Sequence, residues 1–309
     1  MVMQSDWRRR NPMQRMVTDP AAGYTAAALV APANEASGLV EFGLPQARSE
    51  LHAAWQKWRL ALLRGLGPLL LLAAWQITAM YGVIPPEILP APLDIVAAFR
   101  ELIARGELQA ALEVSLARAG LGLAIGGITG LVLGLFAGLW RIGEALFDAP
   151  LQMLRTIPFI ALVPLFITWF GIEETSKVVI IAAAVIFPMY LNTYAGVRGV
   201  DPKLIEAATI FGLTPRQTMR HVIIPTALPS ILVGLRYAAG VSLLALVVAE
   251  QINAQSGIGY ILTSANMAQR LDLLIAGILV YAALGVTIDV VMRAIERTSL
   301  SWMPSTPRL

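Results

Sequence analysis

Cysteine is absent from this chain of 309 residues, and histidine occurs only twice. Without thiols the chain can form no disulfide framework, no thiolate metal site and no cysteine nucleophile. The two histidines, His52 and His221, lie far apart, and no His-Glu-x-x-His segment brings metal ligands together on one helix. The sequence therefore predicts no metal site and argues against a metalloenzyme.

Charged residues are also scarce. They make up 14% of the chain, against about 25% in soluble globular domains, while hydrophobic residues make up 57%. The net charge of +3 is small, and the basic residues fall between apolar segments instead of gathering on the single basic face that a nucleic-acid-binding protein needs. The composition argues against a water-soluble fold and against a nucleic-acid partner. The fold class that we predict, from the long apolar segments of the chain, is an all-α protein that crosses a lipid bilayer several times.

Recognisable catalytic machinery is a third absence. No nucleophile-and-base arrangement and no acidic metal motif falls within one segment, so a membrane-embedded enzyme is the weakest of the alternatives. A Gly-Lys dipeptide is missing too, which excludes the phosphate-binding loop of an ATPase. We therefore expect no catalytic residue and no cofactor on this chain.

The N-terminal part of the chain differs from the rest. Residues 1–48 are rich in Ala, Pro, Gly and Ser without helical or strand periodicity, which predicts a disordered tail. From residue 49 to 64, Leu51, Trp55 and Trp58 recur at helical spacing opposite polar residues. This pattern predicts an amphipathic helix that lies in the membrane interface.

The remaining chain contains long apolar runs. A transmembrane helix needs about 20 mostly apolar residues, and about six segments meet this length. We therefore predict a transmembrane domain over residues 62–298, followed by a C-terminal tail over 299–309. The predicted spans are residues 62–81, 114–139, 149–170, 177–197, 228–250 and 272–293.

Lys and Arg residues gather on one side of these spans. The tail through Arg64 carries eight of them, and the segment between the fourth and fifth spans carries four more. The loops on the other side hold four in total, largely offset by Asp and Glu. The positive-inside rule therefore predicts that both termini are cytoplasmic.

A ladder of glycines runs along the second predicted span at intervals of four residues. Such a ridge without side chains lets another helix approach closely in lipid. Packing inside one subunit is the favoured interpretation, and a sliding surface between subunits is the alternative. The ladder consists of Gly122, Gly126, Gly130, Gly134 and Gly138.

The predicted cytoplasmic loop, residues 200–228, contains two sets of helix signals. Asp201-Pro202 and Thr214-Pro215 each give an N-cap followed by proline, and Gln217 completes a capping box with Thr214. Gly212 is a helix stop, while Pro225 and Pro229 are expected to end the second helix before the next span. We predict an exposed helical hairpin here, either a docking element for a soluble partner or a solvated loop.

The same loop resembles a known motif. Glu206-Ala207-Ala208, followed by Gly212 and then by Val222, Ile224 and Pro225, is similar to the EAA loop of binding-protein-dependent ABC importers. Further segments, among them Gly234-Leu235-Arg236-Tyr237 and Ala249-Glu250-Gln251-Ile252, are similar to the permeases that import aliphatic sulfonates, taurine, nitrate or bicarbonate. The resemblance covers about residues 65–304 and leans toward the sulfonate members, although the long N-terminal tail departs from the family's usual short leader.

This resemblance implies a type I ABC importer permease architecture and a set of partners. It implies a cytoplasmic homodimeric ABC ATPase that binds MgATP, a periplasmic substrate-binding protein, and a second copy of the permease in the bacterial inner membrane. The chain would move a small organic anion, with an aliphatic sulfonate first and nitrate, taurine or bicarbonate as alternatives. The implied ATPase-coupling residues are Glu206, Ala207, Ala208, Gly212 and Pro225.

The substrate path is less marked in the sequence. Glu250, Gln251 and Asn253 lie near the outer end of the fifth predicted span, where polar groups usually face the bundle or a cavity. For Glu250 we favour a structural or gating role, paired with an arginine, over ligand contact. Arg155 and Trp169 are further candidates for the path, but interfacial anchoring is the favoured interpretation for both.

A secondary transporter is the main alternative from another class. Such a transporter would show internal repeats and charged relay residues at the middle of the membrane, and neither is evident here. It would also work without an ATPase, which gives a direct way to separate the two hypotheses.

Overall fold

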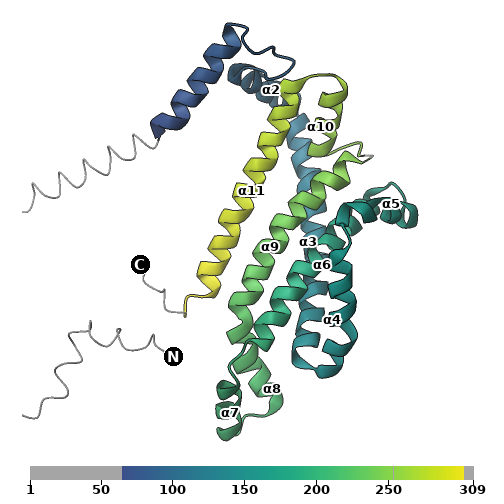
Figure 1. Cartoon of the computed structure of the whole chain (residues 1–309), viewed down its shortest axis with the longest axis vertical. Coiled ribbons are helices and arrows are strands. Elements are labelled where there is room, and N and C mark those ends of the chain that lie inside the picture. The colour runs from purple at the N-terminus through teal and green to yellow at the C-terminus, as the bar shows by residue number, and fades with distance from the viewer. Residues whose placement is uncertain (1–64, 253, 303–309) are drawn as a thin grey trace, which may run out of the picture. The chain divides into compact units, whose positions relative to one another are not determined.

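The computed structural model describes residues 65–252 and 254–302, apart from the side chain of Arg155. The predicted disordered tail, the interfacial helix over 49–64, Asn253 and residues 303–309 lie outside this description. Within the described residues the chain is helical (Figure 1). The helices are Gly65–Met80, α2 (Pro92–Ala104), α3 (Glu107–Leu139), α4 (Arg141–Thr156), α5 (Phe159–Phe170), α6 (Glu174–Arg198), α7 (Pro202–Ile210), α8 (Pro215–Thr218), the π-helix η3 (Met219–Ile223), α9 (Ile224–Gln251), α10 (Ile258–Met267) and α11 (Leu271–Ser299).

Four of the predicted spans are confirmed as helices long and apolar enough to cross a membrane. They are α3, α6, the helix from Pro215 to Gln251 that includes α9, and α11. Of the first predicted span, the described part is the shorter apolar helix Gly65–Met80.

The third predicted span, over 149–170, is not one straight helix. Two helices, Arg141–Leu154 and Phe159–Phe170, meet there at an angle of 103°. The break falls at Ile157 and Pro158, whose backbones are non-helical. Proline disfavours the helical conformation of the residue before it, so the Ile-Pro pair explains the bend. Counted together as one broken span, this pair brings the candidate spans among the described residues to five.

Two further helices occupy regions that were expected to be loops. In α2 the side chains of Ile95, Ala98 and Leu102 are buried at helical spacing. In α10, Ile258, Ile261 and Leu262 are buried in the same way. With 13 and 10 residues, both helices are too short to cross a bilayer, which is why span length alone did not predict them.

The glycine ladder of α3 lies against α6 of the same chain. A Cβ atom on Gly126 would lie 2.3 Å from the carbonyl oxygen of Ala182, and one on Gly130 would lie 2.5 Å from that of Ile186. The other three ladder glycines make similarly close approaches to α6. Only glycine fits at these distances, so the two backbones pack directly on each other.

Helix α9 packs on another part of α6. A Cβ atom on Gly196 of α6 would lie 2.7 Å from Cβ of Ser230, and one on Gly234 would lie 2.6 Å from Cβ of Asn192. Buried apolar side chains from the three helices, such as Ile181, form one core cluster. Helix α6 therefore holds α3 and α9 together.

Candidate functional site

The hairpin between α6 and α9 is built from local backbone signals. The carboxylate of Asp201 accepts a hydrogen bond from the backbone N–H of Lys203 at 2.9 Å, and Pro202 follows it, so both start signals of α7 are confirmed. Thr214 and Gln217 form the predicted capping box of α8. These caps use side chains within three residues of the helix ends.

The end of α7 also follows the prediction. Gly212 has a φ of +77°, a conformation that glycine adopts without strain. The N–H of Gly212 donates to the carbonyl of Thr209, and the N–H of Leu213 donates to that of Ala208, each at 3.0 Å. This pair of hydrogen bonds is a Schellman motif, which closes the C-terminus of α7.

One part of the hairpin prediction is wrong. Pro225 and Pro229 do not end the second helix, because α8 continues through the π-helix η3 into α9. A proline has no N–H and its ring crowds the carbonyl four residues earlier, and a π-turn gives the backbone room for both effects. Pro225 therefore lies in the first turn of α9 and Pro229 lies inside it.

The hairpin exposes both a charge and large apolar side chains. Glu206 is exposed, Ala207 is half-buried and Ala208 is buried. At the tip, the side chains of Ile210 and Phe211 are 84% and 82% exposed. These two residues were not predicted from the sequence, although two large apolar residues directly before the glycine that ends a helix are a usable signal.

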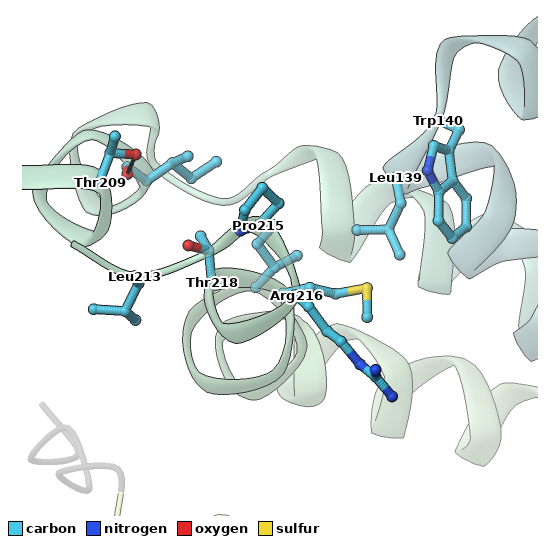
Figure 2. A pocket seen from close by; sticks show the side chains of 10 residues that line it. Leu139, Trp140, Thr209, Leu213, Pro215, Arg216 and Thr218 are labelled. Atoms are coloured by element: carbon cyan, nitrogen blue, oxygen red, sulfur yellow. Dashed lines mark hydrogen bonds between the residues drawn. The ribbon is translucent and has the colours of Figure 1, made fainter.

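A groove of about 600 Å³ lies between the hairpin and the end of α3. Figure 2 shows Leu139 and Trp140 on the side opposite Thr209 and Leu213, with Pro215 between them. The lining is mostly apolar, and Arg216 adds a positive charge. An apolar groove beside an exposed tip is typical of a surface that receives another protein.

The opposite end of the bundle holds a buried ionic network centred on Arg118 of α3, whose side chain is 3% exposed. Arg118 donates to both carboxylate oxygens of Glu174 on α6, at 2.5 and 2.6 Å, and to Oε1 of Glu250 on α9, at 2.7 Å. Its two remaining N–H groups donate to the carbonyl and hydroxyl oxygens of Ser256. All five N–H donors of the guanidinium are therefore used.

The carboxylate of Glu250 is held from four sides. Besides Arg118, it accepts hydrogen bonds from the hydroxyls of Ser115 and Tyr281 and from the backbone N–H of Gly259. The Ser115 hydroxyl in turn accepts from the N–H of Ile258, the first residue of α10. Glu250 and Ser115 thus supply the caps of α10, because the first N–H groups of a helix have no partner inside it.

The close fit at this point depends on a glycine. Gly257, directly before α10, has a φ of +105°, and a Cβ atom there would lie 2.3 Å from Oε1 of Glu250. The network also reaches the surface, since Lys177 donates to Glu174 at 2.8 Å and the Glu174 side chain is 60% exposed. Two positive and two negative side chains thus meet in one cluster.

The expected pairing of Glu250 with an arginine is therefore present, and the partner is Arg118. Arg118 was not among the residues predicted from the sequence, although it is the sole charged residue of the span predicted over 114–139. A charged residue inside an apolar span is by itself a reason to suspect a function, so the signal was available.

A second ionic cluster joins α2 to the start of α11. Arg270 donates to Glu101 at 2.9 Å and to Asp272 at 2.7 Å. The hydrogen bond from Arg270 holds the pKa of Glu101 below its usual range, and the two carboxylates raise the pKa of Arg270. Both groups therefore stay charged at neutral pH.

The other candidates for the substrate path lie apart from this network. Gln251 is the last residue of α9 and is exposed. Trp169 lies on α5 with its side chain 63% exposed, edge-on to Phe166. Asn253 and the side chain of Arg155 are outside the described residues.

The hairpin, α9 and α10 all fall within residues 130–299, which match the family described as binding-protein-dependent transport system inner membrane component. The match covers more than half of the chain. The chain belongs to this family. It is therefore a permease subunit of an ABC importer, as its resemblance to the EAA-loop proteins predicted.

Several relatives of this permease are similar over most of their length. The permease protein SsuC of Escherichia coli strain K12, named for aliphatic sulfonates transport, is 44% identical over 81% of this chain and 95% of its own. The SsuC protein of Bacillus subtilis strain 168 is 42% identical over 77% of this chain and 86% of its own. The taurine transport system permease protein TauC of E. coli strain K12 is 34% identical over 82% and 96%.

Solved structures agree with the fold of this permease. The MetNI methionine ABC transporter in an inward-facing conformation contains a chain with a TM-score of 0.57 and 19% identity, covering 63% of this chain and 97% of that one. A chain of an amino acid ABC transporter crystallised with histidines has a TM-score of 0.55 and 22% identity, covering 65% and 97%. These likenesses confirm the predicted type I importer permease architecture.

Proposed function

We propose that this permease imports aliphatic sulfonates, driven by ATP hydrolysis on a separate ATPase subunit that carries MgATP. The similarity to two proteins named for aliphatic sulfonates transport, over most of both chains, supports this substrate class above the taurine class. A periplasmic binding protein would deliver the substrate. Two copies of the permease would form the path across the bacterial inner membrane, with both termini in the cytoplasm.

The observation that carries the coupling role is the exposed, fully capped hairpin. Its tip presents Ile210 and Phe211 to solvent, and Glu206 lies exposed on α7. A surface that combines apolar anchors with a charge suits docking into a cleft of a soluble protein. Because the hairpin continues directly into α9, a displacement of the docked hairpin would move α9 as well. We assign the hairpin to the ATPase.

Growth on single sulfur or nitrogen sources tests the substrate class. A strain that lacks this permease should fail to grow on ethanesulfonate and should grow on sulfate and nitrate, and the intact chain should restore growth. Loss of growth on taurine alone would replace sulfonates by taurine, and loss on nitrate alone would replace them by nitrate. Uptake that persists without the ATPase and stops when the proton gradient is collapsed would indicate a secondary transporter instead.

The variant Glu206→Lys tests the coupling role. It reverses the charge of an exposed side chain on α7, so the chain should insert normally while the ATPase no longer co-purifies and sulfonate uptake is abolished. Glu87→Lys makes the same change in the loop before α2, far along the chain from the hairpin, and should leave ATPase co-purification intact. Equal recovery of the ATPase with wild type and Glu206→Lys would remove this assignment.

A further inference from the structure

A pocket of about 530 Å³ opens between the end of α9, α10 and the first half of α11. These three elements lie side by side at the end of the bundle opposite α7 and α8 (Figure 1). The pocket is large enough for a small organic molecule. It is lined by Val247, Gln251, Leu262, Thr263, Asn266, Leu274, Ile278 and Tyr281.

The wall of this pocket has two chemically different parts. One part carries the side-chain amides of Gln251 on α9 and Asn266 on α10; both residues are exposed, and neither side chain hydrogen-bonds to another described residue. The other part is aliphatic, with Val247 on α9 and Leu274 and Ile278 on α11. Amide N–H donors beside aliphatic side chains match a molecule with an oxyanion at one end and a short alkyl chain at the other.

The charge behind the pocket is compensated. Tyr281 belongs to the pocket wall, and its hydroxyl donates to Oε2 of Glu250 at 2.9 Å. The Glu250 carboxylate alone would repel an anion in the pocket, but the Arg118 guanidinium hydrogen-bonds to this carboxylate at 2.7 Å and offsets its charge. An anion therefore meets neutral donors without a net negative wall. It also meets no fixed cation among the lining residues, so binding is weak enough to permit release.

We propose that this α9–α10–α11 pocket is a transit site for a small alkyl oxyanion, with Gln251 and Asn266 as the hydrogen-bond donors to its oxygens. Arg118 acts as a positioning residue that neutralises Glu250 behind the site. This inference rests on the proposed import of an organic anion and adds the place where the permease itself holds it.

Reconstituted transport tests this site. The full complex of permease, ATPase and binding protein is placed in proteoliposomes, and ethanesulfonate uptake per ATP hydrolysed is measured with saturating binding protein. Loss of a hydrogen bond to a charged group should lower this ratio about tenfold in Gln251→Leu and in Asn266→Leu. Gln251→Glu should lower it further, because it adds a negative charge, and Gln251→Asn should recover at least half of the wild-type ratio.

Gln109→Leu is the matched control, since it removes an exposed amide from α3 outside the pocket, and it should leave the ratio unchanged. Unchanged ratios in Gln251→Leu and Asn266→Leu, beside a working wild type, would overturn the transit site alone. No ethanesulfonate uptake by the wild-type complex would overturn the proposed function instead. A loss in Gln251→Leu that Gln251→Asn does not recover would also overturn the site, because the loss would then not depend on the amide group.

Discussion

At the hairpin end, α7 and α8 are capped by their own neighbours in sequence, whereas at the other end α10 is capped by side chains from α3 and α9. The hairpin caps, Asp201 and Thr214, are exposed, and the α10 caps, Ser115 and Glu250, are buried. A locally capped element keeps its shape whatever surrounds it, so it can present Ile210 and Phe211 to a partner. An element capped from a distance is fixed to the rest of the fold.

The largest effect that separates the two ends should come from Arg118→Gln. Removing the guanidinium leaves the buried carboxylate of Glu250 without its counter-ion, which should lower the free energy of unfolding by about 3–5 kcal/mol. Chemical unfolding of the purified permease in mixed micelles measures this loss. Arg216→Gln is the control at the hairpin end, because Arg216 is exposed and should change stability by less than about 0.5 kcal/mol. Similar losses of unfolding free energy in the two variants would show that the two ends of the bundle do not differ in this way.

A smaller effect is expected when each end loses one capping hydroxyl. Ser115→Ala removes an acceptor for the N–H of Ile258 and a donor to Glu250, both buried, and should cost about 1–3 kcal/mol. Thr214→Ala removes the exposed cap of α8 and should cost about 1 kcal/mol or less. The same unfolding measurement compares them, and a larger loss in Thr214→Ala would reverse the comparison.

The smallest effect on stability is expected at the tip of the hairpin. Ile210→Ser and Phe211→Ser replace exposed side chains that pack little on the fold, so the free energy of unfolding should change by less than about 0.5 kcal/mol. Affinity for the ATPase should nevertheless fall by at least about tenfold, because apolar anchors provide much of the binding energy of an interface. A clear loss of stability with unchanged affinity would mean that the tip is part of the core.

These contrasts also explain what could be predicted from the sequence. The caps of α7 and α8, the positive φ of Gly212 and four of the spans depend on residues close together in the chain. The glycine ladder predicted close packing, but its partner α6 became known only from the structure. Span length could not predict α2 and α10, because both are too short to cross a bilayer. The bend at Ile157 and Pro158 comes from the non-helical backbone that proline favours in the residue before it, which the mean hydropathy of the segment does not register.

The ionic network was the hardest part to predict. Arg118 and Glu250 are 132 residues apart, and only the packing of α3 and α9 on α6 brings them together. Ser115 and Tyr281 have no distinctive sequence signal at all, since single hydroxyls are common in apolar helices. For Pro225 and Pro229, helix propensity predicted the end of the second helix. The helix continues instead, because a π-turn directly before Pro225 gives its ring room.

The helix that includes α8, η3 and α9 runs without a loop over 37 residues, from Pro215 to Gln251. At 1.5 Å per residue it forms a rod of about 55 Å, nearly twice the hydrocarbon thickness of a bilayer. Such a rod acts as a lever, because a tilt of about 10° about one end moves the other end by roughly 10 Å. Under the proposed coupling to the ATPase, a push on the hairpin would move Gln251 sideways by a distance of the order of the width of a small solute.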